Sequence, residues 1–196
     1  LEEVLSGGGC AGVILNTVKR AQEFAEALSQ RFGEEAVRLF HSRFISPDRA
    51  EREREIVREL GKPDPERHRP ELRILVGTQV LEQSLDIDFD VLITDICPMD
   101  LLLQRIGRLH RHERARPPLL GEARCYVLRD DDAFKAGSLI YGEYLMLRTV
   151  SLLKEEILIP GDVAPLVQAA YDGEPGSDLA GGADYEAAKA KHDGVI

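Results

Sequence analysis

The sequence lacks the features that mark several broad classes of protein. No apolar run approaches the ~20 residues that a membrane-spanning helix needs, so we expect no membrane association. We also expect no signal peptide at the start of the chain. Cys10, Cys97 and Cys125 are odd in number and widely separated, which predicts neither a disulfide framework nor a metal site. This composition favours a reducing cytoplasm.

Glycine-rich nucleotide-binding motifs are absent as well. The sequence contains no G-x-x-x-x-G-K-[ST] phosphate loop, and Lys19 and Lys62 lie in no glycine-rich segment. No glycine fingerprint follows any predicted strand, which disfavours a Rossmann-like enzyme. The chain therefore offers no cradle of its own for a nucleotide.

Charge is distributed unevenly along the chain. The formal net charge of −10 argues against a non-specific nucleic-acid binder. Residues 104–116, however, contain five arginines and two histidines against the single acid Glu113. An acidic protein with one basic groove is compatible with phosphate binding on one face.

Short apolar runs rich in β-branched residues alternate with amphipathic or charged segments. Such runs predict buried parallel strands, and the segments between them predict helices. A chain of 196 residues is long enough for one sizeable α/β domain and a short appendage. We predict a parallel sheet with helices on both faces, formed by strands at 11–15, 36–40, 72–76, 91–94 and 122–128 and by helices at 18–30 and 46–60.

The two ends of the chain have a different character. Residues 1–5 predict the end of a helix, so we expect the chain to begin inside a larger protein. After residue 128 we predict helices at 138–153, 162–171 and 185–191. A segment rich in glycine, proline and acids at 173–182 predicts a mobile linker and a flexible acidic tail. We therefore divide the chain into domains at 1–130 and 131–196.

Polar residues follow several of the predicted strands. Ligands of parallel α/β sheets bind beyond the carboxyl ends of the strands, so these residues predict one shared site. They are Asn16, Thr17, His41, Ser42, Arg43, Thr78 and Asp95.

A second cluster follows the fourth predicted strand. If residues 100–111 form one helix, then Gln104, Arg108 and Arg111 lie at i, i+4 and i+7 on one face. Arginine binds phosphate bidentately, so this face predicts a polyphosphate clamp. The alternative is a solvated basic face. Gly107 favours a ligand or packing role, because glycine inside a helix costs roughly 1 kcal/mol.

Two segments together resemble a known family. TQVLEQSLDIDFD at 78–90 is similar to motif V of superfamily 2 helicases, and QRIGRLHR at 104–111 is similar to motif VI. Together they most resemble the CRISPR-associated helicase–nuclease of type I systems. The resemblance implies a second RecA-like domain, followed by a helical linker segment over 131–196.

The resemblance also implies site residues. Arg108 and Arg111 would be arginine fingers on the γ-phosphate, with Gln104 beside them. Asp86 would face the ribose, and the Ser84 backbone would face the phosphates. Because the phosphate loop is absent, ATP and Mg²⁺ would be held mainly by the first RecA-like domain, and the chain alone would be inactive.

The resemblance further implies nucleic-acid and protein partners. Single-stranded DNA would contact Thr78 and Thr17, with Ser42 and Arg43 as further candidates, and an RNA-guided surveillance complex would recruit the parent protein. Thr17 has an alternative role as a plain helix N-cap. Arg105 points about 100° away from the finger face, which predicts a structural ion pair. No residue here matches the metal ligands of the family's HD nuclease domain.

Two other functions stay open at this point. One is a superfamily 2 DNA or RNA helicase unconnected with CRISPR, since only the finer wording of motifs V and VI separates the two. The other is a RecA-like module that binds nucleic acid or protein without hydrolysing ATP, which the missing phosphate loop fits.

Overall fold

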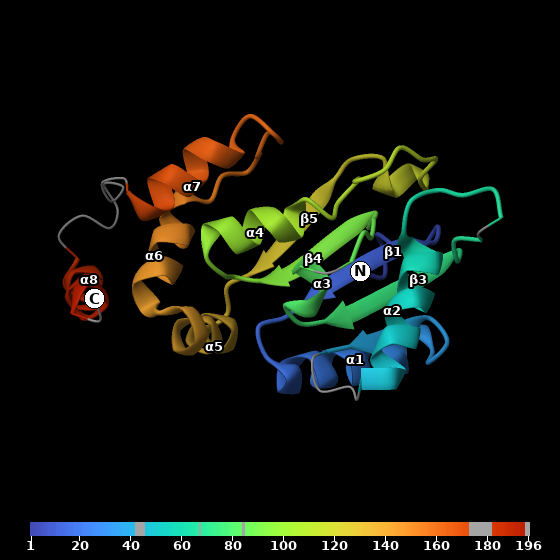
Figure 1. Ribbon diagram of the computed structural model, residues 1–196, viewed down its shortest axis with the longest axis horizontal. Helices are drawn as coiled ribbons and strands as arrows, with labels where there is room; N and C mark the ends of the chain where they lie inside the picture. The colour runs from blue at the N-terminus through green and yellow to red at the C-terminus, as the bar shows by residue number, and fades with distance from the viewer. Residues whose placement is uncertain (42–45, 67, 84, 173–181, 195–196) are drawn as a thin grey trace. The chain divides into compact units, whose positions relative to one another are not determined.

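A five-stranded sheet forms the centre of the fold, in the order β2-β3-β1-β4-β5 (Figure 1). The computed structural model describes residues 1–41, 46–66, 68–83, 85–172 and 182–194. β1 pairs in parallel with both β3 and β4, and β2 pairs in parallel with β3. The strands are β1 (Gly9–Ile14), β2 (Val37–Phe40), β3 (Leu72–Gly77), β4 (Val91–Asp95) and β5 (Arg124–Leu128).

Helices alternate with the strands, and one short helix between β3 and β4 was not predicted. They are α1 (Val18–Phe32), α2 (Ser46–Leu60), α3 (Val80–Gln83) and α4 (Met99–Ile106), with a 3₁₀ turn η1 (Pro118–Leu120) before β5. Every residue of β1 and of β4 is buried, although successive side chains of a strand point to opposite faces. Both faces of the sheet are therefore covered, and the predicted α/β fold is confirmed.

Residues 85–90 run as an extended segment before β4. Leu85, Ile87 and Phe89 alternate with aspartates and join the hydrophobic core that also contains Leu60 of α2. The ring of Phe89 packs directly on the backbone of Gly12, where an added Cβ would come within 2.5 Å of Phe89 Cδ2. Only glycine in the middle of β1 leaves room for this ring.

The chain divides into two compact units, residues 1–94 with 104–127 and residues 95–103 with 128–196. The domain division predicted at residue 130 stays a prediction. The second unit is helical after β5, and its helices are α5 (Asp131–Tyr141), α6 (Glu143–Leu152), α7 (Val163–Tyr171) and α8 (Ala183–Asp193). The buried Arg148 of α6 connects this helix to α7 and α8 by donating to the Ala170 carbonyl at 3.2 Å and to the Tyr185 hydroxyl at 3.3 Å.

Three predicted elements need correction. Residues 1–5 form turns and no helix. The single helix predicted at 138–153 is two helices, because Gly142 has a φ of 89° and interrupts the helical path. Asp130 starts the first of them by accepting a hydrogen bond from the Ala133 amide at 3.0 Å. The linker predicted at 173–182 falls outside the described residues except at position 182.

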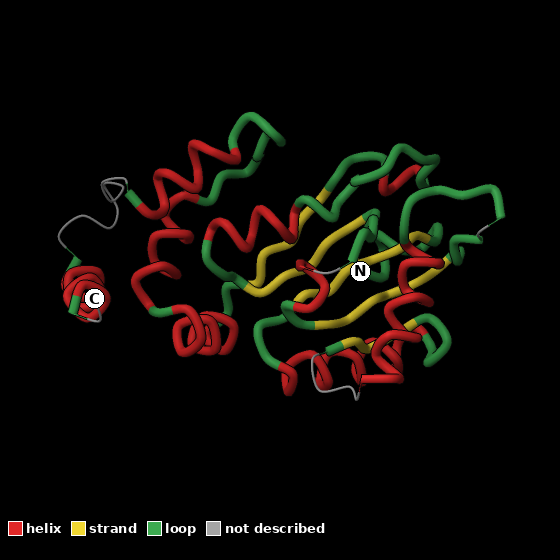
Figure 2. Tube along the Cα trace, viewed as in Figure 1, coloured by secondary structure: helices red, strands yellow, loops and turns green. Residues whose placement is uncertain are grey.

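The third correction concerns the predicted helix over 100–111. α4 ends at Ile106, and the chain then continues to β5 mostly as loop (Figure 2). The Arg108 amide bonds to the Arg105 carbonyl and the Leu109 amide to the Ile106 carbonyl, at 2.9 and 2.8 Å, so the last turn tightens. Arg108 and Arg111 therefore lie beyond the helix, and Gly107 is not inside it. No helix in the described ranges is long and apolar enough to cross a membrane.

Candidate functional site

Polar residues gather where the parallel strands end. Asp95 closes β4 and is buried. Asn16, His41 and Thr78 follow β1, β2 and β3, and all three are buried. Parallel strands end at the same edge of a sheet, so these residues share one rim, as predicted. Gln79 links two of the strand ends by donating from Nε2 to the Asn16 carbonyl at 3.1 Å.

Thr17 caps α1. Its hydroxyl accepts a hydrogen bond from the Arg20 amide at 3.2 Å, and its extended backbone is that of an N-cap. The predicted cap is confirmed, while a contact with nucleic acid stays a prediction. Thr78 is buried directly after β3. Ser42, Arg43 and Ser84 lie outside the described residues.

We expect Thr17→Ala to lower the free energy of unfolding by about 1 kcal/mol, because the Arg20 amide loses its acceptor. Urea-induced unfolding followed by circular dichroism measures this change. Thr17→Asn is the matched control, since asparagine also caps helices, and it should leave the unfolding midpoint unchanged. Equal stability of the alanine variant and the wild type would contradict the capping role.

Arg105 is a structural residue, as predicted. Its side chain is fully buried, and its Nε donates to Glu82 Oε2 at 2.6 Å. Its two terminal nitrogens reach the Thr94 hydroxyl at 2.8 Å and the Asn16 side-chain oxygen at 3.3 Å. This arginine joins the short helix α3 to the ends of β4 and β1, and it is not available to a ligand.

Arg108 lies half-buried beside this ion pair. Its Nη2 donates to the Glu82 carbonyl at 2.6 Å. Its Nε is buried and has no hydrogen-bond partner among the described residues. Burial, followed by the nearby positive charge of Arg111, lowers the pKa of Arg108 below its ordinary value. A buried guanidinium donor without an acceptor is costly, and an anionic oxygen would satisfy it.

Arg111 is held by Asp86. Its Nε donates to Asp86 Oδ1 at 2.6 Å, its Nη1 lies 3.4 Å from the Gly107 carbonyl, and the side chain is 41% exposed. His112 Nε2 lies 3.2 Å from the same Asp86 oxygen. Burial acts to raise the pKa of the Asp86 carboxyl, but the hydrogen bond from Arg111 and the charges of His112 and Arg111 outweigh it and keep this pKa below its usual value.

Gln104 is exposed near the end of α4. Because the helix stops at Ile106, the prediction that Gln104, Arg108 and Arg111 share one helical face is wrong. The two arginines still lie close enough for the charge of Arg111 to lower the pKa of Arg108. A loop and not a helix therefore presents these two arginines, and their predicted role as arginine fingers stays a prediction.

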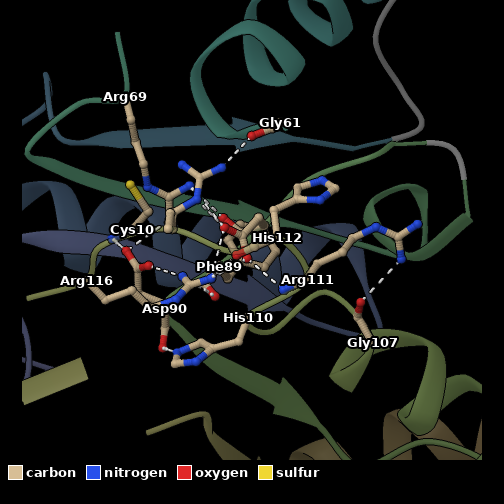
Figure 3. A network of polar contacts seen from close by, with 12 residues as sticks. Cys10, Gly61, Arg69, Phe89, Asp90, Gly107, His110, Arg111, His112 and Arg116 are labelled. Carbon is tan, nitrogen blue, oxygen red and sulfur yellow. Dashed lines mark hydrogen bonds and ion pairs between the residues drawn. The ribbon is translucent and has the colours of Figure 1, made fainter. Parts of the chain in front are cut away.

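Asp88 and Asp90 were not predicted as part of the site. Both are buried, and they bind three arginines from two separate segments of the chain: Arg69, Arg114 and Arg116. Arg69 and Arg116 converge on Asp90, while the Arg111 side chain extends away from them toward Gly107 (Figure 3). The aspartates repeating at every second position in LDIDFD were the available signal.

This network corrects the expectation of one basic groove over 104–116. Arg114 and Arg116 neutralise buried aspartates, and Arg105 neutralises Glu82. Arg108 and Arg111 remain as the cations of this segment with capacity for a ligand. Two adjacent guanidinium groups, one with an unused buried donor, fit the oxygens of a polyphosphate. In the part of the chain that the structure describes, no three His, Cys, Asp or Glu side chains form a metal-binding group.

The parallel sheet, its polar rim and the arginine-bearing loop after α4 define a RecA-like helicase domain. The family model described as CRISPR-associated nuclease/helicase Cas3, C-terminal, matches residues 7–114. The chain therefore belongs to the Cas3 family of CRISPR-associated helicases, of which it forms part of the C-terminal helicase region.

Relatives and solved structures agree with this assignment. The chain is 48% identical over 177 residues to a CRISPR-associated nuclease/helicase Cas3 of Streptococcus thermophilus, covering 89% of this chain and 19% of that protein. It is 36% identical to a Cas3 of Thermus thermophilus, covering 85% and 23%. The crystal structure of T. fusca Cas3-ADP superposes with a TM-score of 0.85 at 33% identity, covering 99% of this chain and 24% of that one. The chain thus spans about a fifth of the length of these relatives.

Proposed function

We propose that this chain is the second RecA-like lobe of an ATP-dependent single-stranded-DNA translocase of CRISPR interference, and that it supplies Arg108 and Arg111 as arginine fingers. The observation that supports this function best is the half-buried Arg108, whose Nε has no partner among the described residues and which lies beside the ion-paired Arg111. An arginine finger acts by meeting charge that develops on a transferring phosphoryl group in a dry cleft.

ATP and Mg²⁺ are the proposed cofactors. Matching structures include T. fusca Cas3-AMPPNP, Cas3-ATP and Cas3-ADP, so nucleotides bind that relative. The unused donor of Arg108 fits a phosphate oxygen, whereas the chain lacks a phosphate loop. We propose that the first RecA-like domain holds most of the nucleotide and the metal. The bound nucleotide supplies the phosphoryl group, and this chain orients it with two guanidinium groups.

Asp86 and Ser84 are proposed as further nucleotide contacts, at the ribose and the phosphates. The Asp86 carboxylate accepts a hydrogen bond from Arg111 Nε at 2.6 Å. If Arg111 moves to the γ-phosphate, this carboxylate loses its strongest donor and can accept a ribose hydroxyl. Closure of the two lobes would therefore exchange one ion pair for two ligand contacts.

Single-stranded DNA is the proposed substrate of the rim. Thr78 and the α1 cap Thr17 lie at the ends of β3 and β1, and Ser42 and Arg43 follow β2. Hydroxyls and backbone amides at strand ends hold phosphates without reading sequence. Opening and closing of the lobes with each ATP would shift this grip along the strand.

The proposed protein partners are the first RecA-like domain and an RNA-guided surveillance complex, in the cytoplasm. The second of these is suggested by a chain of a CRISPR RNA-guided surveillance complex, pre-nicking, which matches with a TM-score of 0.78 at 33% identity over 94% of this chain. We assign these residues no nuclease role.

Arg111→Ala in the full-length protein should lower kcat for DNA-stimulated ATP hydrolysis by about 10²-fold, because a donor to the developing phosphoryl charge is lost. Steady-state turnover at saturating ATP and single-stranded DNA measures the effect. Arg124→Ala is the matched control: Arg124 is also an exposed arginine in an ion pair, with Glu122, and its loss should leave turnover unchanged. Wild-type turnover in Arg111→Ala would favour the binding module that does not hydrolyse ATP.

A further inference from the structure

Residues 107–111, which carry the proposed fingers, lie in no helix or strand, so contacts with another segment must fix their conformation. The Arg108 carbonyl accepts from the Phe89 amide at 2.8 Å, and the His110 amide donates to the Phe89 carbonyl at 3.0 Å. The next amide, that of Arg111, donates to Asp88 Oδ1 at 2.8 Å. These three hydrogen bonds fix the backbone of residues 108–111 relative to residues 88–89.

Asp88 is itself held firmly in place, so it can fix the backbone at Arg111. Its side chain is fully buried, and its own amide donates to the carbonyl of Leu60, the last residue of α2, at 2.8 Å. Arg114 Nε lies 2.6 Å from Oδ2, and Arg116 Nη2 lies 2.9 Å from Oδ1 and 3.1 Å from Oδ2. A carboxylate held by donors on both oxygens cannot rotate, so it offers the Arg111 amide an acceptor in one position.

The burial of Asp88 excludes a direct part in chemistry. A side chain without exposed surface touches neither nucleotide nor DNA, and its charge is neutralised by arginines. Asp90 differs in one respect that matters here. Its carboxylate binds Arg69, Arg116 and the Cys10 amide, and among the described residues it contacts neither Arg108 nor Arg111.

We infer, on the basis of the function proposed above, that Asp88 is a positioning residue for the arginine fingers: its clamped carboxylate fixes the Arg111 backbone. The guanidinium of Arg111 then starts from a defined point, from which its Nε reaches Asp86 Oδ1 at 2.6 Å. Arg114 and Arg116 serve the fingers indirectly, by holding this carboxylate.

The test is Asp88→Asn in the full-length protein, which keeps the size of the side chain and removes its charge. A misplaced finger weakens the transition state more than ground-state binding, so kcat should fall by about 10-fold while KM for ATP changes little. In an Arg111→Ala background the same substitution should cause no further loss. Asp90→Asn, the matched control in the same network, should affect kcat less and should add its own loss to that of Arg111→Ala.

Two results would overturn the inference. One is an Asp88→Asn loss that persists in full in the Arg111→Ala background. The other is an equal loss in Asp90→Asn. Neither result contradicts the assignment of Arg111 as a finger. That assignment is contradicted only if Arg111→Ala hydrolyses ATP like the wild type.

Two further measurements test the inference if Asp88→Asn folds poorly or if Arg111 proves not to be a finger. Arg114→Lys keeps the positive charge but loses the planar guanidinium that forms the ion pair with Asp88, and it should give a smaller loss that also depends on Arg111. Hydrogen exchange of the peptide containing residues 107–113 should be faster in Asp88→Asn than in Asp90→Asn, whatever the turnover. Equal exchange in the two variants would contradict the positioning role.

Discussion

Arg108→Ala in the full-length protein should lower kcat for ATP hydrolysis by about 10³-fold, the largest catalytic effect we expect from any single substitution in this chain. The Arg108 side chain is half-buried and desolvated, and its Nε has no acceptor among the described residues. A donor that has already lost its water gains more from a phosphoryl oxygen than a solvated one does. Arg111, which is 41% exposed and paired with Asp86, should matter less.

Steady-state kinetics with single-stranded DNA present would separate catalysis from binding. Because a finger acts in the transition state, KM for ATP should change far less than kcat. Arg108→Lys retains the charge without the planar fork, so it should recover only part of the lost turnover. Turnover of Arg108→Ala within a few fold of the wild type would remove Arg108 from the catalytic machinery.

Glu82→Ala should lower the free energy of unfolding by about 3–5 kcal/mol, because it removes the carboxylate that forms a fully buried ion pair with Arg105. Arg105 would still donate to the Thr94 hydroxyl and the Asn16 side-chain oxygen, but neither of these acceptors carries a negative charge. For a chain of this size, each kcal/mol corresponds to roughly 2–4 °C in Tm, so the melting temperature of this chain should fall by about 10 °C.

Two comparisons make the Glu82 experiment specific. Glu122→Ala breaks the exposed Arg124–Glu122 pair and should leave the melting temperature unchanged. The double variant Glu82→Leu with Arg105→Met removes both charges and should be more stable than Glu82→Ala alone, because no buried charge is left unpaired. A double variant less stable than the single one would contradict the ion-pair explanation.

Removal of the Glu82 side chain should also affect ATP hydrolysis. Its side chain holds Arg105, and its backbone carbonyl accepts from Arg108 at 2.6 Å. The short helix α3 thus connects the structural arginine to the proposed finger, and its displacement would move Arg108.

The strands were predictable because β1, β3 and β4 are short buried runs, whose apolar composition is strong enough to locate them within two residues. The role of Arg105 was predictable because helical spacing turns it away from its neighbours. The four-residue helix α3 was missed because it is too short to show a period. The end of α4 was missed because contacts with residues 88–89, about twenty positions earlier, replace the helical hydrogen bonds after Ile106.

The candidate site was predictable only in part for the same reason. Motif spacing identified Arg108 and Arg111 as candidates. The sequence could not show which of the five arginines in residues 104–116 form ion pairs with buried carboxylates. That distinction depends on ion pairs formed in the folded chain, since Arg114 and Arg116 bind Asp88 and Asp90.

The pairing of residues 82–90 with residues 105–116 has a consequence for protein engineering. The two segments share a buried ion pair, a clamped carboxylate and a strand-like bridge between Phe89 and Leu109. A chimera that takes only one of them from a relative with a different arrangement of charges would bury an unmatched arginine or aspartate. The two segments should therefore be exchanged together, with Gly12 retained beneath the Phe89 ring.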